Sequence, residues 1–265
     1  MSRVQALSLM LVGCIAFPSA AHDTWLQPRR TAVLPGTIAQ LDLSSSDKFA
    51  AFDTAIKPDR VATARARLSG KTFDIRPGVP EKKSLELRVP LSDPGVATLW
   101  LSLAPQSIDL NRKQVQHYLE DIDAPPLLTQ AWYAGKGTKP WREVYSKHAK
   151  TFVRVGRSKA DRSWSEPVGL ALEIVPEKDP TMLRAGDDFP VRVLRNGTPL
   201  ADFSLGIVRE GKTNRSFKRT DFAGRAVFKL PRAGKWLLRG TELRSSQKPA
   251  TDWESDFTTL LFEVQ

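Results

Sequence analysis

Two long stretches of the chain, residues 25–105 and 166–265, alternate apolar with polar positions in short runs. The runs end at Gly, Pro, Asp, Asn and Ser, and the Asn196-Gly197 pair is a hairpin signal. Alternation with a period of two between turn residues is typical of half-buried antiparallel strands. The pattern therefore predicts a mainly β chain with two antiparallel β-sandwich domains of the immunoglobulin or transthyretin type.

The period changes between residues 107 and 155, where we expect a short helical insertion. The first apolar stripe has the spacing i, i+3, i+4 and i+7 and consists of Val115, Tyr118, Leu119 and Ile122. The second has the spacing i, i+4, i+7 and i+11 and consists of Trp141, Tyr145, His148 and Phe152. Both spacings place the residues on one face of a helix. His148 should then be buried like an aromatic residue, and we expect His148→Tyr to be tolerated.

Residues 156–165 are polar and basic and lack a hydrophobic period. Such a segment is typical of an exposed connection between domains. We therefore expect an N-terminal β-sandwich with the helical insertion over residues 22–156, and a C-terminal β-sandwich over residues 166–265.

The first 21 residues have the organisation of a signal peptide. Arg3 gives a positive start, residues 6–17 are apolar, and Ser19 and Ala21 are the small residues that cleavage after Ala21 requires. The apolar run is too short to span a bilayer, which needs about 20 residues. We expect residues 1–21 to direct export and to be removed, which leaves a soluble protein that begins with His22.

Two other processing events are open alternatives. Leu11-Val12-Gly13-Cys14 resembles a bacterial lipobox, and lipidation of Cys14 would anchor the protein to a membrane and leave His22 internal. Cleavage after Ser19 would make His22 the third residue, where two backbone amides and the amine can wrap Cu(II) or Ni(II). Phe17 at position −3 disfavours that cut.

Composition limits the chemistry of the exported chain. Cys14 is the only cysteine and Met182 the only methionine outside the leader, which disfavours disulfides, thiolate ligands and a sulfur-rich Cu(I) carrier. The net charge is +11, but the basic residues are scattered, so we expect no nucleic-acid partner. Imidazole, amine and carboxylate groups are left as candidate metal ligands.

His22 is the strongest candidate for a metal ligand. As the first residue it would offer its α-amine and a ring nitrogen to the same ion. Asp23 or a second imidazole such as His148 would complete a site for Ni, Co, Cu or Zn. His117 falls on a charged face of the first predicted helix, near Glu120, and we expect it to be solvated.

Several motifs together resemble the NikM-like family of bacterial envelope proteins, DUF4198. They are His22-Asp23-Thr24-Trp25-Leu26, Tyr145-Ser146-Lys147-His148-Ala149-Lys150, the passage over residues 179–186, and the later Asn196-Gly197 and Gly234-Lys235-Trp236 patterns. The resemblance implies a periplasmic accessory protein of nickel, cobalt or other transition-metal uptake, with membrane uptake components as partners and no established enzymatic activity. His148 departs from the family, in which an aromatic residue is expected.

Three functions follow from these observations. The first is an exported periplasmic accessory that binds a transition metal ion or its chelate in support of uptake. The second is a non-catalytic interaction or ligand-binding module of the envelope. The third is a copper-dependent oxidative enzyme in which His22 and either His117 or His148 hold the ion. The chain has no nucleotide-binding loop, His-Glu-x-x-His or Gly-x-Ser-x-Gly motif that would indicate another enzyme class.

Overall fold

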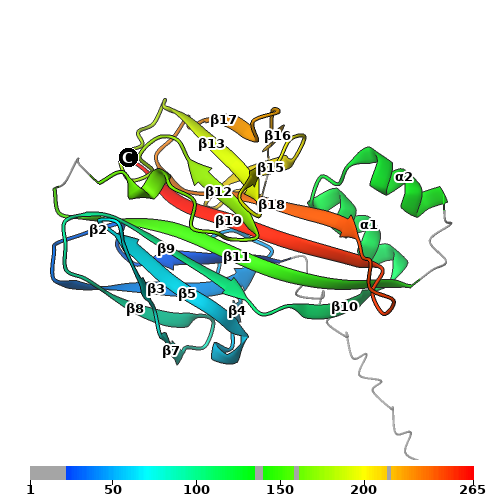
Figure 1. Ribbon diagram of the computed structural model, residues 1–265, viewed down its shortest axis with the longest axis horizontal. Coiled ribbons are helices and arrows are strands. Elements are labelled where there is room, and N and C mark those ends of the chain that lie inside the picture. The colour runs from blue at the N-terminus through cyan, green and yellow to red at the C-terminus, as the bar shows by residue number, and fades with distance from the viewer. Residues whose placement is uncertain (1–21, 135–139, 158–160, 214–215) are drawn as a thin grey trace, which may run out of the picture.

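A computed structural model describes residues 22–134, 140–157, 161–213 and 216–265. Three β-sheets are stacked in layers, with a ten-stranded sheet in the middle and a smaller sheet on each of its faces (Figure 1). The prediction of a mainly β chain with antiparallel sheets and a helical insertion is confirmed. The predicted leader, residues 1–21, lies outside the described residues. No helix in the described ranges is long and apolar enough to cross a membrane.

The central sheet has the strand order β16 (Ser216–Arg219), β15 (Ser204–Arg209), β18 (Gly234–Ser245), β19 (Trp253–Val264), β11 (Trp141–Val155), β9 (Gly95–Leu103), β5 (Val61–Leu68) and β6 (Lys71–Asp74). Two further strands pair with β11, namely β2 (Ala32–Val33) and β10 (Gln106–Leu110). Strands β11 and β19 run parallel, from the pair Glu143 and Trp253 to the pair Thr151 and Leu261. One sheet therefore contains strands of both predicted sandwiches.

The smaller sheets cover opposite faces of the central one. One contains β1 (Asp23–Pro28), β3 (Thr37–Ser46), β8 (Leu85–Leu91), β7 (Pro77–Pro80) and β4 (Thr54–Ala55). The other contains β12 (Leu172–Pro176), β13 (Asp188–Arg195), β14 (Thr198–Pro199) and β17 (Arg225–Lys229). On β11, Val153 belongs to the apolar core under the first sheet and Phe152 to the core under the second. Because successive strand residues point to opposite faces, β11 is buried from both sides.

The prediction of a helix over Trp141 to Phe152 is wrong, because this segment is the long strand β11. Trp141 and Tyr145 point to one face of the strand, and His148 and Phe152 to the other. Over residues 147–153 both faces of the strand are buried, so apolar and polar residues do not alternate there, and the aromatic positions of β11 fall by chance at helical spacing.

The first predicted helix is confirmed as α1 (Arg112–Asp121), and its predicted apolar stripe is buried. Its start is fixed by a capping box, in which the Asn111 side chain and the Gln114 side chain each accept a hydrogen bond from the other residue's backbone N–H. A second helix that the sequence pattern did not predict, α2 (Pro126–Ala134), follows directly. Pro126 begins this helix, as proline does readily at a first helical position.

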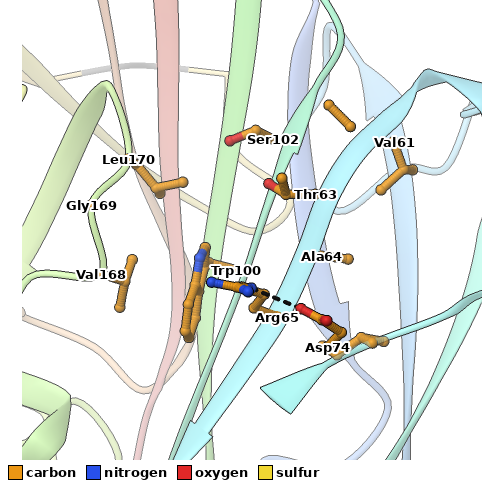
Figure 2. Close-up of a pocket in the computed structure, with 12 residues that line it drawn as sticks. Val61, Thr63, Ala64, Arg65, Asp74, Trp100, Ser102, Val168, Gly169 and Leu170 are labelled. Carbon is orange, nitrogen blue, oxygen red and sulfur yellow. Dashed lines mark hydrogen bonds and ion pairs between the residues drawn. The ribbon is translucent and has the colours of Figure 1, made fainter. Parts of the chain in front are cut away.

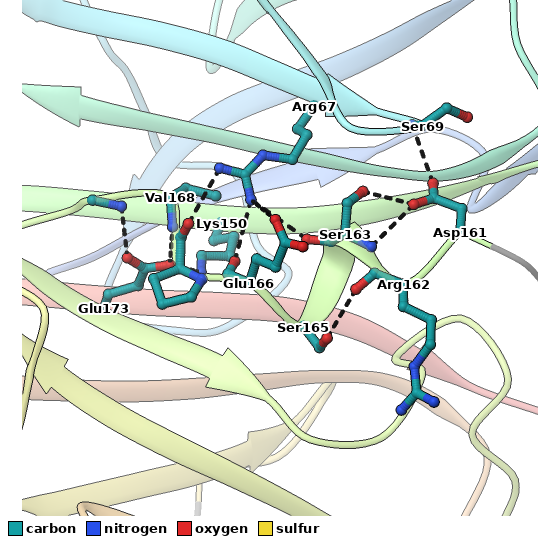
Figure 3. Close-up of polar contacts among 12 residues, drawn as sticks. Arg67, Ser69, Lys150, Asp161, Arg162, Ser163, Ser165, Glu166, Val168 and Glu173 are labelled. Carbon is teal, nitrogen blue, oxygen red and sulfur yellow. Dashed lines mark hydrogen bonds and ion pairs between the residues drawn. The ribbon is translucent and has the colours of Figure 1, made fainter.

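The segment predicted as an exposed connection is tied to the central sheet (Figure 3). It contains the short 3-10 helix η3 (Ser163–Ser165), whose Trp164 is buried. The Asp161 carboxylate accepts hydrogen bonds from the backbone N–H groups of Ser69, Val96 and Ser163, at 3.2, 3.0 and 3.0 Å. Ser163 and Trp164 therefore pack as part of the fold, whereas Arg157 and Arg162 are exposed as predicted.

Candidate functional site

His22 lies directly before β1, and its backbone oxygen accepts a hydrogen bond from Lys147 of the central sheet. Its ring nitrogen Nδ1 is buried and has no hydrogen-bond partner among the described residues. Burial lowers the pKa of His22, and the neighbouring Lys147 lowers it further. The ring is therefore neutral near pH 7, and a neutral imidazole is the form that binds a metal ion.

Asp23, the second sequence-predicted ligand, is occupied by a buried ion pair. Its Oδ1 accepts a hydrogen bond from Nε of Arg239 at 2.7 Å, and both side chains are almost fully buried. Arg239 also donates from Nη2 to Oδ2 of Asp121 at 2.9 Å, which ties β1 to β18 and to the end of α1. Metal binding by Asp23 would break this pair, so the structure gives Asp23 a positioning role beside His22.

Two other carboxylates influence the His22 ring. Asp47 and Asp53 lie in the segment after β3, and both raise the pKa of His22 against the larger effect of burial. Asp53 also accepts a hydrogen bond from the Ser46 hydroxyl. Within the described ranges, no group of three or more His, Cys, Asp or Glu side chains is arranged to hold a metal ion.

Lys147 is a buried lysine that sequence reasoning missed. Its Nζ donates a hydrogen bond to the backbone oxygen of His22 at 2.7 Å and lies 5.4 Å from the ring centres of Tyr145 and Phe257. Burial lowers the pKa of Lys147 to about 7, and Asp23 offsets part of this effect. Strongly shifted ionisable groups are concentrated at functional sites, which makes Lys147 a candidate.

A cavity of about 280 Å³ lies beside Lys147 and reaches the surface. It is formed where β1, β3, β10, β11 and the segment around the 3-10 helix η2 (Pro58–Arg60) come together. Its polar lining includes Thr24, Arg60, Gln106, Tyr145 and Lys147. The hydroxyl of Tyr145 donates to Oε1 of Gln106 at 2.7 Å, which fixes that wall of the cavity.

His148 is buried, as predicted, but through polar contacts rather than aromatic packing. Its Nδ1 lies 2.9 Å from the Ser102 hydroxyl, and its Nε2 lies 3.1 Å from Oδ1 of Asp256. The other oxygen of Asp256 accepts a hydrogen bond from Arg244 at 2.8 Å. Both ring nitrogens are occupied, so a metal ion would have to displace Ser102 or Asp256.

These contacts reverse the expectation that His148→Tyr is tolerated. Tyrosine cannot pair with Ser102 and Asp256 at once, and an unsatisfied buried polar group costs about 1–3 kcal/mol. We expect urea unfolding to show a loss of that size for His148→Tyr. Tyr145→Phe, which loses the hydroxyl contacts with Gln106 and Arg60, is the control and should cost about 1 kcal/mol. A His148→Tyr protein as stable as the natural one would contradict the assigned contacts.

A comparison with known protein families identifies the family of this chain. The model of a domain of unknown function, DUF4198, matches residues 19–241. The chain belongs to the DUF4198 family. No curated protein matches it.

Several solved structures resemble the DUF4198 chain at low identity. The three N-terminal domains of the outer capsid protein Hoc of bacteriophage RB49 are 9% identical with a TM-score of 0.20, over 91% of this chain and 59% of that one. The adhesin InvE of Yersinia pseudotuberculosis is 11% identical with a TM-score of 0.22, over 91% and 59%. The D00-D0 domain of intimin is 8% identical with a TM-score of 0.21, over 91% and 99%. The DUF4198 chain thus spans less than two thirds of the first two structures.

The three histidines of the DUF4198 chain do not converge. The backbone oxygen of His22 contacts Lys147. His148 is the next residue after Lys147 along β11, so its side chain points to the opposite face of that strand. His117 lies on the exposed side of α1, with its Nδ1 4.0 Å from a Glu120 oxygen. A copper site that combines His22 with His117 or His148 therefore has no support from this geometry.

A larger cavity of about 580 Å³ lies against β5 and β9 of the central sheet (Figure 2). Trp100 and Ser102 of β9, the ion pair of Arg65 with Asp74, and residues 168–170 line it. Ser102, His148 and Asp256 are the residue types of a hydrolase triad, but the serine faces Nδ1 and the carboxylate Nε2, the reverse of the order in serine proteases. We therefore interpret the chain of hydrogen bonds as structural.

Proposed function

We propose that this DUF4198 protein is exported to the periplasm, begins with His22 after cleavage, and binds a transition metal ion there in support of uptake. The observation that carries the proposal is the buried Nδ1 of His22, which lacks a hydrogen-bond partner among the described residues. Nδ1, and not Nε2, is the ring nitrogen that closes a six-membered chelate ring with the α-amine of the same residue. An unsatisfied buried nitrogen is costly, and a metal ion would satisfy it.

The surroundings of His22 support the same proposal. Its lowered pKa keeps the ring neutral at periplasmic pH, and the nearby Asp47 and Asp53 offer oxygen ligands of opposite charge to the ion. Two nitrogens with carboxylate oxygens suit Ni, Co, Cu or Zn, and the sequence provides no sulfur near the site. The ion would be cargo or signal for membrane uptake components, the partners that the family resemblance implies.

The test compares the affinity for metal ions of proteins with an altered terminus and of a control variant with the natural terminus. Calorimetric titration with Ni(II), Cu(II) and Zn(II) is made on protein that begins with His22, on protein with one glycine added before His22, and on His22→Ala. Because the added glycine removes the free α-amine from His22, we expect both changes to weaken binding at least about tenfold, or 1.4 kcal/mol. His117→Ala is the matched control and should bind like the unaltered protein. Equal affinity of the glycine-extended protein would refute the chelate.

A further inference from the structure

The cavity beside Lys147 carries an excess of positive charge. Lys57, Arg60 and Lys147 line it, whereas Asp59 is the one acidic residue in its described lining. Lys57 and Asp59 are exposed at the rim, Arg60 is half-buried, and Lys147 is buried at the inner wall. Arg60, and Lys147 when it is protonated, therefore place positive charge on the inner side of the cavity, where an anion would be least screened.

Arg60 has the geometry of a ligand-binding group. It is the last residue of the 3-10 helix η2, lies next to the Tyr145 hydroxyl, and forms no ion pair among the described residues. A guanidinium offers two parallel N–H groups, which match the two oxygens of a carboxylate. The hydroxyls of Thr24 and Ser45, 2.9 Å apart, add further polar groups to the lining of the cavity.

The remaining wall of the cavity is apolar and consists of Ala55, Ile56 and Leu103. An inorganic anion would leave this wall facing water, whereas an organic acid can place carbon atoms against it. We propose that the cavity binds a small organic acid, whose carboxylate is held between Arg60 and Lys147. The volume of about 280 Å³ limits the ligand to a few carbon atoms. This proposal does not depend on metal binding at His22.

The experiment measures binding of succinate and citrate to the full exported protein by calorimetry. Metal is first removed with a chelating resin, because soluble chelators such as EDTA are themselves carboxylates. Phosphate and sulfate are titrated at matched ionic strength. We expect at least one organic acid to bind, and Arg60→Gln to weaken it at least about tenfold through loss of the bidentate contact. Arg65→Gln, a change at another arginine that faces the other cavity, should leave the affinity unchanged.

Two sources of the carboxylate are separated by repeating the citrate titration with Ni(II) and in His22→Ala. Binding of metal-free citrate to His22→Ala identifies the free acid as the ligand. Binding that requires both Ni(II) and His22 identifies a metal chelate whose carboxylate Arg60 recognises. The proposal is overturned if neither acid binds under any of these conditions, if phosphate binds as tightly as both acids, or if Arg60→Gln binds them like the unaltered protein. Failure of metal binding at His22 alone leaves it standing.

Discussion

Glu173→Gln is expected to destabilise the protein by about 3–5 kcal/mol, because it breaks a fully buried ion pair. Glu173 pairs with Lys150 of β11, and both side chains are almost completely buried. The same carboxylate accepts hydrogen bonds from the backbone N–H groups of Val168, Gly169 and Leu170, at 2.8, 2.9 and 3.3 Å. Figure 3 shows Glu173 beside Val168 and Lys150. Removing its charge weakens the anchor of this loop and leaves the Lys150 ammonium without a counter-charge.

Glu166 provides the control for this substitution, since it lies on the same loop with its side chain 68% exposed and 3.5 Å from Arg67. Glu166→Gln should change the free energy of unfolding by no more than about 0.5 kcal/mol. Urea unfolding at pH 7 compares the two variants. A loss below 1 kcal/mol for Glu173→Gln would contradict the buried pair.

Lys147→Met is expected to stabilise the protein at pH 7 by about 2–4 kcal/mol. Burial lowers the pKa of Lys147 from 10.5 to about 7 in the folded state, and each unit corresponds to about 1.4 kcal/mol. The lost hydrogen bond to the His22 oxygen offsets about 1 kcal/mol of this gain. Methionine keeps the length of the side chain without its charge.

The lowered pKa of Lys147 also determines how the stability difference between the two proteins changes with pH. Between pH 7 and 10.5 the unfolded chain holds a proton on Lys147 that the folded protein has released, so the stability of the natural protein rises with pH. The advantage of Lys147→Met should therefore be greatest at and below pH 7 and vanish near pH 10.5. Urea unfolding across this range measures it. A Met variant that is less stable at pH 7, or a gap that does not change with pH, would show that Lys147 is not held as described.

A lysine that lowers stability at its own position is more readily explained by function than by folding. Proteins often retain such residues at binding sites, where activity is gained at the expense of stability. We expect the stabilised Lys147→Met protein to bind succinate and citrate more weakly. Higher stability together with weaker binding of the acids would show that Lys147 serves binding and not the stability of the fold.

The sequence pattern predicted strands well where only one face is buried. Leu85, Leu87 and Val89 of β8 are buried and Arg88 is exposed, so the alternation was visible. It failed at β11, where Lys147, His148 and Lys150 are all buried, Lys147 on one face of the sheet and His148 and Lys150 on the other. Their hydrogen bonds join residues far apart in the chain, and no local pattern reports them.

The candidate site was predicted only in part for the same reason. The choice of His22 follows from its position after the predicted leader, and its expected chemistry follows from the residue type. The partners of His22 and Asp23 cannot be predicted from the local sequence, because Arg239 lies 216 residues from Asp23 and Lys147 lies 125 residues from His22. Arg60 gave no signal, because a single arginine near a proline is common in exposed turns.

Metal coordination at His22 is tested most directly by anomalous diffraction from crystals of the protein that begins with His22, grown with Cu(II) and measured at the copper edge. We predict one strong anomalous peak at about 2.0–2.1 Å from both Nδ1 of His22 and its α-amine nitrogen, the usual range for a metal–imidazole bond. An ion bound elsewhere, at His117 for example, or no peak within bonding distance of the His22 nitrogens, would contradict the N-terminal chelate.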